Sequence, residues 1–137
     1  MNATTSRRQL KLVSNDATPF LPLIPEQNIH DRRVKKVIQF MKEDLARPMS
    51  LESLAAAADI SPRQLSRLFH LETEYSPIHY LHELRFAEAC FLLGSSWLRV
   101  KDICFQVGFE NLSNFRNEFK KRKGCSPSKF RQKKWCG

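Results

Sequence analysis

The sequence predicts an all-α fold in which a long connecting helix joins two helix-turn-helix subdomains, with about seven helices in total. Three observations lead to this prediction. From Asp31 onward apolar residues recur at helical spacing, and no segment alternates as a strand would. Residues 50–81 match residues 99–130 in pattern, which indicates an internal repeat. Finally, a serine followed by proline occurs at three places, and this pair is typical of helix starts.

The first 28 residues differ from the rest of the 137-residue chain. After a polar, aperiodic stretch, Pro19, Pro22 and Pro25 recur every third residue, which favours an extended chain over a helix. We therefore expect a flexible, proline-containing leader over residues 1–28 and one domain over residues 29–137. No signal peptide and no membrane-spanning apolar run is visible, so we expect a cytoplasmic protein without a membrane partner.

The first half of the domain contains one helix and then a helix-turn-helix. An apolar stripe from Val34 to Leu45 predicts the first helix. Ser50 is placed to cap a short helix, and Ser61 begins a capping box that opens the second helix of the motif. The first helix-turn-helix is therefore expected over about residues 50–72.

The second half repeats this arrangement after a longer helix. The connecting helix is expected over about residues 77–93, and Gly94 is placed to stop it. A second helix-turn-helix is expected over about residues 100–123, with Asn111 as the cap of its second helix. Ser126 and the following proline predict a last short helix.

The second helix of each repeat divides into two faces. The apolar positions, three and four residues apart, are Leu65, Leu68 and Phe69 in the first repeat and Leu112, Phe115 and Phe119 in the second. Opposite them lie Arg63, Ser66 and Arg67 in the first repeat and Ser113, Arg116 and Asn117 in the second. Each residue of the second set lies fifty positions after its counterpart in the first. The apolar face is expected to pack on the domain, which leaves the polar face free. For Leu112, packing and contact with a thymine methyl group both remain open.

The positive charge is concentrated at the end of the chain. Residues 29–115 hold 11 basic and 11 acidic side chains, whereas residues 116–137 hold nine basic residues and only Glu118 against them. Such a patch favours a polyanion such as DNA, RNA or an acidic membrane surface, and a merely solvated basic tail is the alternative.

The residues described so far resemble a known family. SLESLAAAADISPRQLSRLF, LRFAEACFLL and VKDICFQVGFENLSNFRNEFKKRKGCSPSKFR are similar to the DNA-binding domain of AraC/XylS-type transcription regulators, over residues 31–134. This chain departs from the family pattern at three positions: Asp59 and Tyr75 stand where glycine is common, and Cys104 where alanine is common. We expect strained turns at Asp59 and Tyr75. The usual effector-sensing domain is absent, so we expect no small-molecule effector for this chain.

The resemblance implies a transcription regulator that binds double-stranded DNA and reads two successive major grooves. Its implied base-reading residues are Arg63, Ser66, Arg67, Ser113, Arg116 and Asn117. Arginine suits guanine and asparagine suits adenine. The implied phosphate-binding residues are Asn111, Asn114, Lys120, Lys121, Arg122 and Lys123. The connecting helix, with the subdomain offsets added, can set the two recognition helices about 34 Å apart, one turn of B-DNA. RNA polymerase is a second candidate partner.

Other classes of function find little support in the sequence. His79 and His82 lie three residues apart, but no cysteine is placed to complete a zinc site, so we expect no metal and no cofactor. No nucleophile-base pair or phosphate loop is present, so we expect no enzyme activity. Cys90 and Cys104 fall in apolar helical patterns and are expected to be buried, reduced thiols. One alternative stays open: a protein-interaction module, or an antagonist of a full-length regulator, that keeps the fold without reading DNA.

Overall fold

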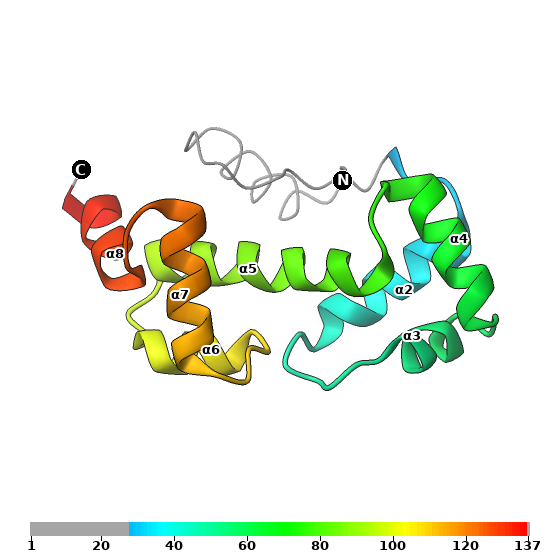
Figure 1. Cartoon of the computed structure of the whole chain (residues 1–137), viewed down its shortest axis with the longest axis horizontal. Coiled ribbons are helices and arrows are strands. Elements are labelled where there is room, and N and C mark those ends of the chain that lie inside the picture. The colour runs from blue at the N-terminus through cyan, green and yellow to red at the C-terminus, as the bar shows by residue number, and fades with distance from the viewer. Residues whose placement is uncertain (1–27, 137) are drawn as a thin grey trace. The chain divides into compact units, whose positions relative to one another are not determined.

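The computed structural model describes the backbone of residues 28–136 and the side chains of residues 28–134 (Figure 1). In this part of the chain there are seven α-helices and no strand, so the all-α prediction is confirmed. The helices are α2 (Arg32–Glu43), α3 (Leu51–Ala57), α4 (Pro62–Thr73), α5 (Pro77–Ser95), α6 (Val100–Gln106), α7 (Leu112–Lys123) and α8 (Pro127–Cys136). Except for Asn28, the predicted leader lies outside the described residues.

The described residues form two compact units, and the boundary between them falls inside α5, between Arg85 and Phe86. We call residues 28–85 the amino-terminal unit and residues 86–136 the carboxyl-terminal unit. α5 has 19 residues and contributes its first half to one unit and its second half to the other. Among the described helices, none combines the length and the apolar character needed to cross a lipid bilayer.

The core of the amino-terminal unit joins α2, α3 and α4 to the first half of α5. Its buried residues are Ile29, Val34, Val37, Ile38, Met41, Leu54, Ala55, Ala58, Leu65, Phe69, Tyr80 and Leu81. The rings of Phe69 and Tyr80 meet edge to face with centroids 5.3 Å apart, a geometry that aromatic pairs prefer. Arg85 fixes the loop between α2 and α3, because its guanidinium donates to the carbonyl oxygens of Leu45 and Arg47 at 2.9 and 3.0 Å.

The core of the carboxyl-terminal unit has the same plan. Its buried residues are Phe86, Ala89, Cys90, Leu93, Ile103, Cys104, Val107, Phe115 and Phe119. The four from α5 match the four buried residues of α2 position by position at an offset of 52. The second half of α5 therefore serves the carboxyl-terminal unit as α2 serves the amino-terminal unit. Each unit thus combines one helix (α2 or the second half of α5) with a helix-turn-helix and a further helix (the first half of α5 or α8), so the internal repeat is longer than the helix-turn-helix alone.

Side-chain caps define where the helices begin. Ser50 and Ser53 cap reciprocally at the start of α3, and Ser61 and Gln64 do the same at the start of α4, so the predicted capping box is confirmed. Asn111 accepts a hydrogen bond from the backbone N–H of Asn114, which confirms the predicted cap of α7. These caps satisfy N–H groups that a helix leaves without a partner at its first turn.

Among residues 28–136, four positions in the turns have a left-handed backbone, and they match in pairs across the two repeats. Asp59 has φ 58° and Gly108 has φ 105°, each in the turn before a recognition helix. Glu74 has φ 68° and Gly124 has φ 81°, each directly after a recognition helix. The prediction of a strained turn at Tyr75 was wrong by one residue. The left-handed backbone lies at Glu74, the position at which the second repeat has Gly124.

Candidate nucleic-acid interface

Helix α4 is held to its unit by one face and presents arginine on the other. Leu65 and Phe69 are fully buried, which fixes the rotation of the helix about its axis. Arg63 and Arg67 are exposed and lie one turn apart on the opposite side. Ser66 was expected on the same outward face, but it lies at the edge of the face and is half-buried.

Helix α7 is arranged in the same way. Phe115 and Phe119 are buried, and Leu112 packs against the same core, which favours packing over contact with a base. The outward residues at the positions that match those of α4 are Ser113, Arg116 and Asn117, and all three are exposed. The structure thus presents two short polar surfaces, one in each unit, at matching positions of the two repeats.

The predicted phosphate-binding residues of α7 fall into two groups, and the first is exposed. Lys120 and Lys121 are exposed in the last turn of the helix. Asn114 is also exposed near its start. Asn111 is exposed too, but its side-chain oxygen is used by the helix cap, so its amide N–H groups are the ones available to a ligand.

The second group, Arg122 and Lys123, packs against aromatic rings of its own unit. Arg122 donates to the Glu118 carboxylate at 3.0 Å, and its guanidinium carbon lies 4.1 Å from the centre of the Phe86 ring. Only 19% of its side chain is exposed. The Lys123 ammonium lies 5.4 Å from the centre of the Phe130 ring. These contacts count against Arg122 as a phosphate ligand. Glu118, four residues earlier, indicated in the sequence that Arg122 could pair within its own helix.

The two units differ strongly in charge. The amino-terminal unit has nine basic and eight acidic residues, whereas the carboxyl-terminal unit has eleven basic and four acidic residues. The difference is largest at the ends of the recognition helices. Where α7 ends in consecutive basic residues, α4 has His70, Leu71 and Glu72, and Leu71 is 69% exposed.

The cysteines of the described residues are largely buried. Cys90 and Cys104 are buried, and Cys125 is half-buried. Burial raises the pKa of the Cys104 thiol, although the charge of Arg116 opposes this shift, so the thiol stays protonated at neutral pH. Within the described residues, no three histidine, cysteine or acidic side chains come together as ligands for a metal ion.

A sequence profile of the helix-turn-helix domain family matches residues 54–133, which is more than half of the chain. The HTH-type transcriptional activator RhaR of Salmonella schwarzengrund is 30% identical over 115 residues, or 84% of this chain and 39% of RhaR. The arabinose operon regulatory protein of Escherichia coli K12 is 31% identical over 102 residues, or 74% of this chain and 35% of that protein. The chain therefore spans less than half the length of these relatives.

Solved structures share the same fold. The C-terminal domain of AraT, a response regulator from Geobacillus stearothermophilus, is 32% identical with a TM-score of 0.68, covering 75% of this chain and 86% of that domain. The DNA-binding domain of AdpA, a global transcriptional factor in complex with a target DNA, is 28% identical with a TM-score of 0.69. That match covers 75% of this chain and 93% of the AdpA domain.

Proposed function

Because the chain belongs to the AraC family of helix-turn-helix DNA-binding transcription regulators, we propose that α4 and α7 read two successive major grooves of one DNA duplex. The observation that carries this proposal is the pair of exposed polar surfaces at matching positions of the two recognition helices. The likeness to a DNA-binding domain that was solved on its target DNA supports it.

In the first groove, we assign base recognition to Arg63 and Arg67, with Ser66 at the edge of the contact. An arginine side chain has a planar fork of donors that matches the O6 and N7 acceptors of guanine. Both arginines are exposed in the first half of α4, and the amino-terminal residues of a recognition helix contact base edges. Neither side chain is drawn into the core, which supports their availability to the DNA.

In the second groove, we assign base recognition to Ser113, Arg116 and Asn117. The amide of Asn117 can bond adenine through its N6 and N7 atoms, and Arg116 can bond guanine. Phosphate binding is assigned to Lys120 and Lys121, with smaller parts for Asn111, Asn114 and Lys123. Contacts of this kind supply affinity without sequence information.

The length of α5 is consistent with two grooves. A helix of 19 residues is about 28 Å long at about 1.5 Å per residue. This length is of the same order as the roughly 34 Å of one turn of B-DNA. A single chain would then cover two successive grooves, and dimerisation would not be needed to do so.

The test distinguishes base recognition from phosphate binding by comparing Arg67→Ala with Lys121→Ala. Selection of bound sequences from a random DNA pool should show that Arg67→Ala relaxes the choice at one or two base pairs and loses about 1–3 kcal/mol on the preferred site. Lys121→Ala should weaken binding to specific and random DNA alike and lower the salt slope by about one.

A matched control is Arg67→Lys, which keeps the charge but lacks the planar fork. It should retain affinity for random DNA and lose the base preference. If Arg67→Ala keeps the parent's base preferences, Arg67 holds a phosphate instead of reading a base. If the parent selects no sequence at all, the protein-interaction alternative replaces the proposal.

A further inference from the structure

An open cleft of about 430 Å³ lies in the amino-terminal unit, outside the two recognition helices. It is lined by Asp31, Arg32, Arg33, Lys36 and Ala58. Three of these five residues are basic, and all three come from the first two turns of α2. Ala58 ends α3 and begins the turn that leads into α4. The cleft therefore joins a basic surface of α2 to the turn of the first helix-turn-helix.

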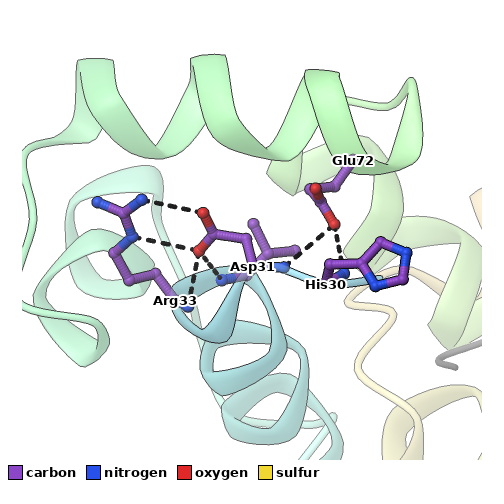
Figure 2. Close-up of polar contacts among 5 residues, drawn as sticks. His30, Asp31, Arg33 and Glu72 are labelled. Carbon is purple, nitrogen blue, oxygen red and sulfur yellow. Dashed lines mark hydrogen bonds and ion pairs between the residues drawn. The ribbon is translucent and has the colours of Figure 1, made fainter. Parts of the chain in front are cut away.

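One of the three positive charges in the cleft is already neutralised. The Arg33 guanidinium contacts the Asp31 carboxylate, with Nη2 2.9 Å from Oδ2 and Nε 3.2 Å from Oδ1 (Figure 2). The Arg33 guanidinium holds the pKa of the Asp31 carboxyl below its usual range, and the pKa of Arg33 is raised in turn. Asp31 also accepts from the backbone N–H groups of Arg33 and Val34, so these N–H groups are not available to an anion.

The other two basic residues have no acidic partner among the described residues. Arg32 and Lys36 are exposed and lie one turn apart on α2. Among residues 28–134, no hydrogen bond or ion pair involves either side chain. The helix that carries them is held firmly, because Glu72 of α4 accepts from the backbone N–H groups of His30 and Asp31 at 2.7 and 3.3 Å (Figure 2). The start of α2 is thus tied to the last turn of α4.

A comparison of the two units indicates a role for Arg32 and Lys36. At the matching positions of α5, Leu84 corresponds to Arg32 and Glu88 to Lys36, so the carboxyl-terminal unit has no such basic pair. The carboxyl-terminal unit instead places Lys120 and Lys121 at the end of its recognition helix. At that place the amino-terminal unit has only His70 and Leu71. An exposed basic pair thus lies at the start of α2 in the amino-terminal unit and another at the end of α7 in the carboxyl-terminal unit.

We propose that Arg32 and Lys36 bind DNA phosphates that flank the groove read by α4. The inference rests on the proposed function, because it takes α4 as a groove-reading helix. The residues at the start of such a helix lie nearest the DNA, and the cleft reaches the turn directly before that start. Two uncompensated cations at this place match the phosphate backbone in charge. In this arrangement α2 supplies the phosphate binding that the end of α4 lacks.

The test measures the salt dependence of binding to a short duplex of random sequence for Arg32→Gln, Lys36→Gln and the parent. Each variant should bind about fivefold more weakly near physiological salt, and each should lower the slope of log K against log salt by about one. Base preferences in a selection experiment should not change. Lys35→Gln is the matched control, because it removes the same charge from the same helix outside the cleft. Its slope should equal that of the parent.

Thermal unfolding of all four proteins shows whether a loss of binding has a structural origin. The exposed positions predict melting temperatures close to that of the parent. If Arg32→Gln and Lys36→Gln keep the parent's slope, or change it no more than Lys35→Gln does, the inference is overturned while the proposed function stands. If the parent itself binds no DNA, the proposed function fails and this inference fails with it.

Discussion

Glu74 has a backbone conformation that the second repeat assigns to glycine. Its φ of 68° lies in the left-handed region, and the matching residue after α7 is Gly124 with φ 81°. A side chain with a Cβ atom raises the energy of this conformation, whereas glycine adopts it freely. Asp59 also has a left-handed backbone where the second repeat has Gly108, although aspartate tolerates this conformation better than most residues. The first repeat therefore stores backbone strain at two turns.

We predict that Glu74→Gly stabilises the protein. Relief of the strain should exceed the greater freedom of glycine in the unfolded chain and raise the free energy of unfolding by about 0.5–1 kcal/mol. Urea denaturation monitored by circular dichroism measures this change. Glu74→Ala is the control, because it removes the same charge but keeps the Cβ atom, and it should bring no such gain. Equal stability of the glycine and alanine variants would show that the left-handed backbone at this position does not lower the free energy of unfolding.

Asp31 links stability to pH. It caps α2 and pairs with Arg33, and the pKa of its carboxyl is lowered in the folded protein, chiefly by the hydrogen bond from the Arg33 side chain. A lowered pKa means that the folded state prefers the carboxylate. The stabilisation is therefore fully present above the pKa of the unfolded chain and is lost as the pH falls through the folded-state value.

We predict that Asp31→Ala lowers the free energy of unfolding by about 0.5–2 kcal/mol at neutral pH, as loss of a helix cap does. The difference from the parent should shrink as the pH falls below the usual range for an aspartate. Denaturation at a series of pH values measures it. Asp31→Asn retains a capping oxygen without the charge, so it should lose less than Asp31→Ala. A difference that stays constant down to low pH would contradict the role of the carboxylate.

At the scale of the element, α7 is fixed by a cluster of phenylalanine rings. Phe119 is fully buried and lies with its ring centre 5.4 Å from that of Phe86, 5.8 Å from that of Phe115 and 5.3 Å from that of Phe130. These neighbours come from α5, α7 and α8. One side chain thus determines how three helices of the carboxyl-terminal unit pack, and it keeps the polar face of α7 turned outward.

We predict that Phe119→Ala lowers the free energy of unfolding by about 3–5 kcal/mol, because it leaves a cavity among rings that cannot close around it. Chemical denaturation measures the loss. Phe105→Ala on α6 is the control, since that side chain is 44% exposed and its removal should cost much less. A Phe119→Ala protein as stable as the parent would refute the packing described for α7.

At the scale of the whole molecule, positive charge determines how the protein responds to salt. The carboxyl-terminal unit holds most of the net charge, and the amino-terminal unit is nearly neutral. Each phosphate that a basic side chain neutralises releases counterions from the DNA, which makes binding weaker as salt rises. The carboxyl-terminal unit is therefore expected to supply most of the affinity that does not depend on sequence.

We predict that log K falls with log salt with a slope of about −5 to −9 on the preferred site, because several phosphates are neutralised. Fluorescence anisotropy with a labelled duplex at several salt concentrations measures the slope. Random DNA should also be bound, more weakly, with a salt dependence of its own. An affinity that does not change with salt would contradict a role in DNA binding.

Much of the fold and part of the site could be predicted from the sequence, because both depend on local rules. Helical periodicity placed Phe115 and Phe119 on the buried face of α7 and Arg116 on the exposed face. Capping residues marked helix starts at Ser61 and Asn111. Side-chain spacing and caps act over three or four residues, so they can be recognised without knowledge of the tertiary structure.

Only the tertiary structure showed which basic side chains pack against aromatic rings of the protein and which border a cleft. Arg122 follows Lys121 in a basic run, yet it lies over Phe86, 36 residues earlier in the chain, and the run itself contains no sign of that ring. Arg32 and Lys36 appeared in the sequence only as the polar side of a helix, until packing brought them beside Ala58. Periodicity tells which side of a helix faces inward, but contacts between helices depend on how their faces pack, and that is a property of the folded chain.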